Sequence, residues 1–319
     1  MALTDMKVFN AQVQTATIET LAQMVDKFNA ASAGAIQLTT QGFEGDYRYE
    51  NFWQSVHAAR RRVDRYATNN TASPTSLAQL QSVGVKVAGG FGPILWEPGQ
   101  LSWVQKSPAE AVEVISRNLA EAIMQDQLNT AIAALVAAIE NQSDAKWDTG
   151  TGPLTYADIN LAHAKFGDMS QMIVCNVMDG AQYHALIGQN LTNSARLFDA
   201  TGVQVVDILG KRVVVTDAPA LRETGTGADV KVLGLVSGAA VVYDGSDLVT
   251  NIETSNGKHR IETTMQADYS FGLALKGYAW DTANGGKSPT DVELATGSNW
   301  DKVATSIKHT AGVIALANV

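Results

Sequence analysis

Residues 107–141 read SPAEAVEVISRNLAEAIMQDQLNTAIAALVAAIEN, and no further glycine or proline follows until Gly150. Ser107 can cap the first free amides, Pro108 suits the first helical turn, and Glu110 can close a capping box. About 34 helical residues would span roughly 50 Å, whereas an average helix has only ~11–12 residues. The stretch therefore predicts one long helix that supports the rest of the molecule.

This predicted helix has two apolar stripes. The first consists of Val112, Ile115, Leu119 and Ile123, and the second of Met124, Leu128, Ile132, Leu135 and Ile139. Both have helical spacing, but they are offset by about 100°, the turn of one residue. The two halves of the helix must therefore pack against different surfaces. Such packing fits a helix that crosses a flat molecule and does not fit a member of a simple bundle.

The segments before the long helix predict an arm and a long excursion. Residues 1–32 form the arm, with a helix that begins near residue 15. The segments 34–49 and 83–104 have the composition of extended chain, and between them residues 51–67 have the periodicity of an amphipathic helix. Two extended segments around such an excursion are typical of a long β-hairpin that projects from a body.

The segments after the long helix predict a compact α/β lobe and a return to the first lobe. The lobe has helices at 155–166 and 179–188, a polar loop at 189–200, and strands at 172–177, 203–208, 212–216, 230–236 and 239–243. Residues 203–208 and 212–216 read as a hairpin. The segments 258–267 and 269–280 read as a strand pair with a bend near Asp268, and 313–317 read as the last strand. We expect an α+β fold.

Composition limits the function classes of this 319-residue chain. A net charge of −9 argues against a dedicated nucleic-acid binder, which would usually be basic. The one cysteine, Cys175, lies in an apolar run and is interpreted as a packing residue. The start of the chain lacks the basic and apolar regions of a signal peptide, and the most apolar run, 131–139, is far shorter than the ~20 residues of a membrane span. We expect a soluble protein from a reducing cytoplasm, with no membrane partner.

No catalytic or metal-binding motif has the required spacing. Residues 286–288 read Gly-Lys-Ser, but Asp281 stands where a phosphate-binding loop needs its first glycine. Leu235 stands where a nucleophile elbow around Ser237 needs glycine. The five histidines are scattered, with no pair at i, i+4. The sequence therefore predicts no enzyme, no cofactor and no metal site.

An arginine cluster interrupts the acidic chain at Arg60, Arg61, Arg62 and Arg65. It has three readings: a solvated surface, an intersubunit contact, or a weak and salt-sensitive contact with a phosphate backbone. For an intersubunit contact, the acidic candidates on a neighbouring chain are Asp5, Glu19, Asp26, Glu44 and Asp46.

The order of these parts resembles a known family, and several stretches carry the same resemblance. These stretches are Val85-Lys86-Val87 with Gly92-Pro93, Asp126-Gln127-Leu128-Asn129 in the long helix, the block 272–278 (GLALKGY) and the segment 295–300 (ATGSNW). The chain resembles the major capsid protein of tailed bacteriophages, with the Hong Kong 97-type capsid fold.

The resemblance implies five parts and a function. The parts would be an N-terminal arm (1–33), an extended loop (34–100), a peripheral domain with the spine helix (101–152), an axial domain (153–255), and a peripheral return with the C-terminal segment (256–319). The subunit would self-assemble as hexamers and pentamers into an icosahedral shell around double-stranded phage DNA. Its partners would be other copies of itself, a portal, possibly scaffolding or cement proteins, and packaged DNA through non-specific contacts. Assembly would take place in the host cytoplasm and the product would be the virion capsid.

Aromatic residues near the base of the predicted hairpin are candidate contact anchors, because aromatic side chains contribute much of the binding energy of interfaces. The candidates are Phe91, Trp96 and Trp103, although Trp103 fits the core of its own subunit equally well. Two other functions remain open: the shell of an encapsulin-like cellular compartment, and a soluble hydrolase that uses acidic residues.

Overall fold

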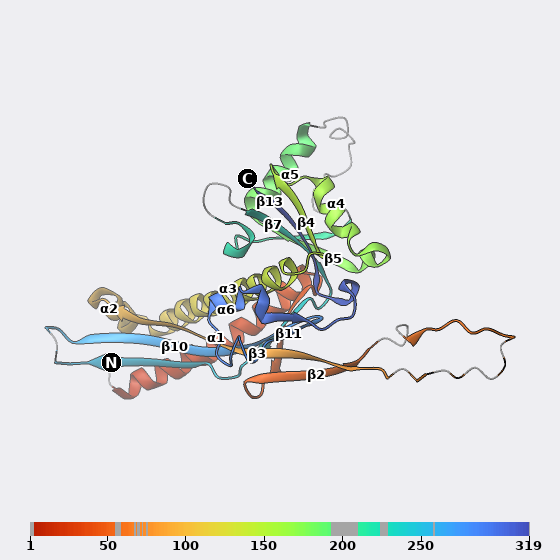
Figure 1. Ribbon diagram of the computed structural model, residues 1–319. Helices are drawn as coiled ribbons and strands as arrows, with labels where there is room; N and C mark the ends of the chain where they lie inside the picture. Colours follow the sequence, from red (N-terminus) through yellow and green to blue (C-terminus); the bar gives the residue numbers. More distant parts are fainter. Residues whose placement is uncertain are drawn as a thin grey trace.

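The computed structural model describes residues 3–54, 59–66, 68, 71, 73–74, 76–192, 210–223, 229–257 and 259–318. These residues form an elongated lobe on a six-stranded sheet and a compact lobe on a five-stranded sheet. The helix α3 (Pro108–Glu140) runs along the elongated lobe and ends beneath the compact one (Figure 1). The α+β class is confirmed.

Helix α3 confirms the predicted long helix to within one residue at each end. The predicted capping box is wrong, because the Ser107 side chain makes no capping hydrogen bond. Ser107 also ends the preceding helix α2 (Pro98–Lys106), where its N–H donates to the carbonyl of Trp103 at 3.0 Å. Its backbone is therefore shared between two helices, and the side chain does not take the position of an ordinary cap.

Burial along α3 changes from one-sided to nearly complete. In the first half Leu119, Ile123 and Gln127 are buried on one side, whereas almost every residue from Thr130 to Ile139 is buried. The helix contacts strands of the first sheet, and also the 3-10 helix η4 (Pro219–Leu221) and strand β13 (Gly312–Asn318) of the second lobe. Packing in two directions is therefore confirmed. By length and composition α3 could also cross a membrane, but 56% of its apolar window is buried inside the protein, as in a core helix.

The first sheet has the strand order β1-β8-β10-β3-β2, with β9 beside the outer part of β10. The strands are β1 (Ile36–Gly42), β2 (Tyr47–Trp53), β3 (Gln79–Trp96), β8 (Ala240–Asp244), β9 (Val249–Ser255) and β10 (Glu262–Leu275). Only β1 and β8 pair in parallel. The predicted division into two strands near Asp268 is wrong, because β10 is one strand in which Asp268 pairs with Gly90 on one side and Val249 on the other. The register with β3 shifts nearby, between Met265 and Ala267.

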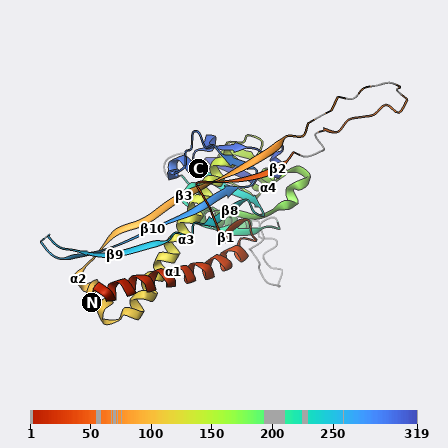
Figure 2. The same ribbon diagram turned by 90° about the horizontal axis from the view of Figure 1, so that it is seen from below.

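Strands β2 and β3 form an antiparallel ribbon that leads out of the body (Figures 1 and 2). The projecting excursion is confirmed, but the amphipathic helix predicted at 51–67 is wrong. Residues 51–53 belong to β2, and 60–66 are not helical. An isolated short helix is stable only if its apolar stripe is packed, and here Val63 is 65% and Tyr66 88% exposed. No described surface covers these two residues of the predicted apolar stripe.

The N-terminal arm is a longer helix than predicted. Helix α1 (Leu3–Ala31) begins near the start of the chain and lies beside α3 (Figure 2). It buries Phe9, Val13 and Val25 in the core of the same chain. The arm helix therefore packs against its own subunit.

The predicted extended chain over 94–104 is also wrong beyond Trp96, where β3 ends. Helix α2 follows at once, with Pro98 in its first turn. The side-chain oxygen of Gln100 accepts a hydrogen bond from the backbone N–H of Glu97 at 2.9 Å. These local signals start helix α2 and therefore end strand β3 at Trp96.

The second sheet has the strand order β4-β13-β7-β5-β6. Its strands are β4 (Lys146–Thr151), β5 (Ile173–Met178), β6 (Arg212–Val215), β7 (Asp229–Val236) and β13, and helices α4 (Tyr156–Ala164) and α5 (Gly180–Thr192) belong to the same lobe. Thr155, the first residue of the helix predicted at 155–166, caps α4 and exchanges hydrogen bonds with Asp158. The proposed hairpin partner at 203–208 and the loop beyond 192 lie outside the described residues. The described half of that hairpin, β6, pairs in parallel with β5.

Smaller elements close the elongated lobe. Strands β11 (Tyr278–Trp280) and β12 (Trp300–Lys302) pair with each other, and Trp280 packs against Trp300 with ring centroids 4.9 Å apart. Helix α6 (Asp291–Leu294) and the 3-10 helices η5 (Gly297–Asn299) and η6 (Ile307–His309) lie in the same C-terminal part of the chain, whereas the 3-10 helix η2 (Gly167–Met172) contacts α4 and β5 of the compact lobe.

The two sheets divide the chain differently from the five predicted ranges. Strands β8 and β9 fall in the range 153–255 but pair in the first sheet, whereas β13 falls in 256–319 but pairs in the second. Strand pairing joins segments that are distant along the chain, so sheet membership does not follow chain order. As functional domains of a shell subunit, the five ranges stay a prediction.

Candidate intersubunit surfaces

The projecting ribbon carries the arginine cluster. Arg60, Arg61, Arg62 and Arg65 are all exposed, and none of them forms an ion pair with a described carboxylate. The neighbouring Asp64 instead accepts a hydrogen bond from the N–H of Tyr66 at 3.0 Å. Four cations thus stand away from the body of an acidic chain. This placement suits contact with another molecule and gives little to the fold of the subunit itself.

Exposed aromatic residues follow the same ribbon. Tyr49 is 54% and Trp53 71% exposed, and both lie on β2. Neither residue is among the predicted contact anchors, and the helix predicted at 51–67 places Trp53 outside any strand. Alternation of Tyr47, Tyr49 and Trp53 at a period of two is a strand signal that was available.

The predicted anchors Phe91 and Trp96 lie elsewhere. Phe91 stacks on Tyr269 with ring centroids 5.6 Å apart, and the nearly buried Trp96 meets the edge of Phe9 at 6.3 Å. Both therefore contribute to packing within the subunit, while Trp103 on α2 is partly exposed. Nothing in the structure brings Phe91 and Trp96 together with the arginine cluster, and their role in intersubunit contact stays a prediction.

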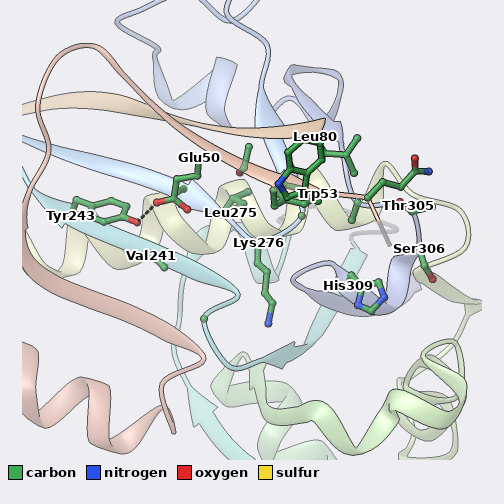
Figure 3. A pocket seen from close by; sticks show the side chains of 17 residues that line it. Glu50, Trp53, Leu80, Val241, Tyr243, Leu275, Lys276, Thr305, Ser306 and His309 are labelled. Carbon is green, nitrogen blue, oxygen red and sulfur yellow. Dashed lines mark hydrogen bonds between the residues drawn. The ribbon is translucent and has the colours of Figure 1, made fainter. Parts of the chain in front are cut away.

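A groove of about 750 Å³ lies at the base of the ribbon (Figure 3). One wall is the outer face of the first sheet, with Phe52, Leu80 and Tyr243, and the other is the segment 304–309. The hydroxyl of Tyr243 donates to Glu50 at 3.5 Å, and the Arg48 guanidinium lies 4.2 Å from the centre of the Tyr243 ring. The walls are mostly apolar and the charged groups stand among them.

Lys276 and His309 face the same groove (Figure 3). Burial lowers the pKa of Lys276, whose ammonium donates to the carbonyl of Ser237 at 3.2 Å. An apolar recess with a few charged groups at its margin is the composition of a protein-contact surface. We find no pair of groups here with the geometry of a nucleophile and its base.

Charged groups also join the two lobes at the end of α3. Lys231 of β7 is almost buried, and its ammonium lies 3.1 Å from both Glu140 and Glu223. Burial alone would lower the pKa of Lys231, but the two carboxylates outweigh burial and raise it. Lys146 of β4 meets Glu140 as well, at 3.5 Å. The last turn of the spine helix is thus fixed to two strands of the compact lobe.

A second polar contact fixes the middle of α3 to β10. The Tyr269 hydroxyl donates to the Asp126 carboxylate at 2.5 Å. Burial raises the pKa of Asp126, and Asp291 raises it further, although the bond from Tyr269 opposes both. A side chain at Gly89 would place its Cβ only 2.8 Å from Cζ of Tyr269. Gly89 therefore leaves the space that the tyrosine ring occupies across β3.

The described groups that resemble catalytic residues have structural surroundings. Cys175 is buried and burial raises the pKa of its thiol to about 11, so it is a poor nucleophile. The buried His163 lies with Nε2 2.9 Å from Oδ1 of Asn176, and burial lowers its pKa. Across the part of the chain that the structure describes, no group of three His, Cys, Asp or Glu residues could hold a metal ion.

Comparison with solved structures identifies the class of fold. The capsid protein in the asymmetric unit of Cyanophage Pam1 superposes with a TM-score of 0.55 at 11% identity, over 89% of this chain and 88% of that one. A structure from Mycobacterium phage Cain gives a TM-score of 0.53 at 9% identity, over 88% of each chain. The capsid of Helicobacter pylori bacteriophage KHP30 gives 0.50 at 8% identity, over 91% of this chain and 90% of that one. The fold is that of a Hong Kong 97-type phage capsid protein, as predicted.

Sequence comparison then assigns the family. A family model described as Gp13-like, major capsid protein 13-like, matches residues 5–314. The chain belongs to this family of major capsid proteins. The major capsid protein of Bacillus phage SPP1 is 24% identical over 203 residues, which span 62% of this chain and 62% of that relative. The predicted class, a structural protein of a phage capsid shell, is confirmed, and the comparisons do not favour the encapsulin-like or hydrolase alternatives.

Proposed function

We propose that this chain assembles as hexamers and pentamers into an icosahedral shell that encloses double-stranded phage DNA. The observation that supports it most directly is the ribbon, which carries exposed aromatics and four arginines away from the body of an acidic subunit. A projection with so little contact to its own chain gains stability when a neighbouring copy covers it.

The arginine cluster contacts carboxylates of a neighbouring subunit. Of the candidates, Glu19, Asp26, Glu44 and Asp46 are exposed and have no ion pair with any described residue, which supports this pairing. The side chain of Asp5 lies outside the described residues. An exposed ion pair is weak by itself, but one shell repeats the same contact on every copy.

The other partners follow from the shell. A portal, scaffolding or cement proteins, and packaged DNA bound without sequence preference complete the set. Assembly takes place in the host cytoplasm and the product is the virion capsid. The subunit acts as a container wall and not as an enzyme, and membership of a major capsid protein family supports this role.

The test uses a matched pair of charge reversals. Arg61→Glu with Arg65→Glu lowers the net charge by four, and so does the control Lys287→Glu with Lys302→Glu, which changes exposed residues of the body. We expect shells by negative-stain microscopy and light scattering for the unmodified chain and the control. The arginine variant should stay as small species with an unchanged circular dichroism spectrum. Normal shells from it would assign the cluster to plain solvent, and a stable 34 kDa monomer from the unmodified chain would refute the shell itself.

A further inference from the structure

Helix α1 covers two edges of the first sheet. At the β9 edge, the side-chain amides of Asn10 and Gln14 donate to the carbonyls of Thr250 and Leu248 at 2.7 and 2.5 Å. At the β1 edge, the side-chain NH₂ of Asn29 donates to the carbonyl of Leu38 at 2.7 Å, and its side-chain oxygen accepts from the N–H of Leu38 at 2.9 Å. Side chains of one helix thus bond backbone groups that a neighbouring strand would otherwise bond.

The edge at β2 has no such cover. On either side of β2, two backbone hydrogen bonds point toward β3. The carbonyl of Asp46 accepts from the N–H of Lys86, and the N–H of Gln54 donates to the carbonyl of Ala78, at 3.0 Å each. Because both groups of a residue point to the same neighbour in an antiparallel ladder and successive residues alternate, the even-numbered residues of β2 face β3. The backbone groups of Tyr47, Tyr49, Asn51 and Trp53 therefore point outward, and no described residue bonds them.

Three of the usual protections against strand addition are missing from this edge, and its charges, Arg48 and Glu50, are of opposite sign. Proteins block free edges with proline, bulges or a covering segment. Strand β2 contains no proline, and its register with β3 runs without interruption from Tyr47 to Trp53. It lies along the margin of the molecule (Figure 1). The edge is thus open to a further strand.

Within one subunit Arg48 and Glu50 lie 3.0 Å apart, and the same two charges favour one arrangement of a second copy over the two registers next to it. In an antiparallel pair centred on Tyr49, Arg48 of each copy stands opposite Glu50 of the other, at a distance where opposite charges attract. A centre at Arg48 places two arginines opposite each other, and a centre at Glu50 places two carboxylates opposite each other. Both of these registers are repulsive. Strand β2 is therefore complementary to itself in the register centred on Tyr49.

We propose that β2 pairs edge to edge with β2 of a second subunit, antiparallel and centred on Tyr49, so that two first sheets become one continuous sheet across a two-fold axis. Such a contact is isologous, since the same patch serves both copies. The inference rests on the proposed shell, which supplies the neighbouring subunit. The inference specifies the groups that form one contact of the shell. They are the outward backbone groups of β2 and two ion pairs, each between Arg48 of one copy and Glu50 of the other.

The geometry allows a direct crosslinking test. The two copies of residue 49 form a hydrogen-bonded pair with Cα atoms about 5.5 Å apart, which is within the range of a disulfide. We expect Tyr49→Cys particles to give a covalent dimer on a non-reducing gel after mild oxidation. The matched control is Asn51→Cys, because the two copies of residue 51 lie four residues apart along the strands, about 13 Å. The buried Cys175 gives no background.

A charge exchange tests the register a second time, with the yield of the same crosslink as the readout. In the Tyr49→Cys background, Arg48→Glu alone and Glu50→Arg alone place like charges opposite each other, and each should lower the dimer yield at least tenfold. The double exchange restores opposite charges and should restore the yield. In the unassembled chain each variant should keep the circular dichroism spectrum of the unmodified protein.

The outcomes separate this inference from the proposed function. Shells without a Tyr49→Cys dimer, or with a dimer from Asn51→Cys instead, overturn the inference and leave the shell standing. A crosslinked band with a different virion protein overturns it in favour of a heterologous strand. If Tyr49→Cys itself does not assemble, the charge variants are compared in the chain that keeps Tyr49. Equal shell formation by Arg48→Glu and by the double exchange would then overturn the inference. Absence of shells from the unmodified chain refutes the proposed function.

Discussion

Replacing Tyr269 by phenylalanine removes one hydroxyl and leaves the ring in place, so it isolates the contact between β10 and the spine helix. The hydroxyl donates to Asp126 at 2.5 Å, and the carboxylate is half-buried. A hydrogen bond to a charged group contributes roughly 1.5–3 kcal/mol. We therefore expect Tyr269→Phe to cost about 2 kcal/mol in the free energy of unfolding of the unassembled protein.

Urea unfolding measures this cost. With a slope of about 3 kcal/mol per M, the midpoint should fall by about 0.7 M. In the Asp126→Asn background the same change should cost only about 1 kcal/mol, because the bond then joins neutral groups. The matched control is Tyr243→Phe, whose hydroxyl lies at 3.5 Å from the exposed Glu50 and which should cost less than about 0.5 kcal/mol.

The pH dependence supplies a second readout. Because burial raises the pKa of Asp126 above the ordinary 3.8, the folded state binds more protons, and this group lowers stability as the pH rises from about 3.8 through its raised pKa. Asp126→Asn removes that part of the slope. Equal costs of Tyr269→Phe in both backgrounds, or an unchanged slope in Asp126→Asn, would refute the assignment of this contact.

Three further experiments test the interior. Gly89→Ala pushes a Cβ against the Tyr269 ring and should cost about 1–3 kcal/mol in urea unfolding, whereas Gly99→Ala in α2 meets no atom within 4 Å and should be neutral or stabilising. Since burial lowers the pKa of His163 below 6.5, its contribution to stability is present above pH 6.5 and is lost as the pH falls through the lowered pKa. His163→Gln should reduce this loss when the free energy of unfolding is measured between pH 7.5 and 5. An unchanged slope of that free energy against pH would contradict the reasoning. The Cys175 thiol should react with a disulfide reagent only after unfolding, so rapid labelling of the native protein would show that it is accessible.

Elements with local signals were predicted closely. The long helix needed only a proline at its start and the absence of glycine, and α3 ends within one residue of the expectation. The helix at Thr155 needed only its capping residue. In such cases the neighbouring residues along the chain decide the structure, because helix hydrogen bonds and caps join residues three or four positions apart.

Elements that depend on distant partners were predicted poorly. Residues 51–53 fit a helical stripe, but β3 draws them into a ladder. Strand β10 continues through Asp268 because two other strands pair with it there. The same reason explains the candidate site: the arginines were visible in the sequence, but their isolation on a ribbon and the open edge of β2 depend on which strands lie beside which.

The sequence by itself determined the spine helix, the projecting excursion and the resemblance to capsid proteins, because helix periodicity, turn residues and the order of parts are local properties. Only the tertiary structure decided which sheet each strand joins and which edge stays uncovered. Helix α1 covers β1 and β9 with side-chain amides, while β2 remains open along the margin of the molecule. Long-range pairing has no signature at fixed spacing, so the surface on which one subunit meets another appears only once the sheet is assembled.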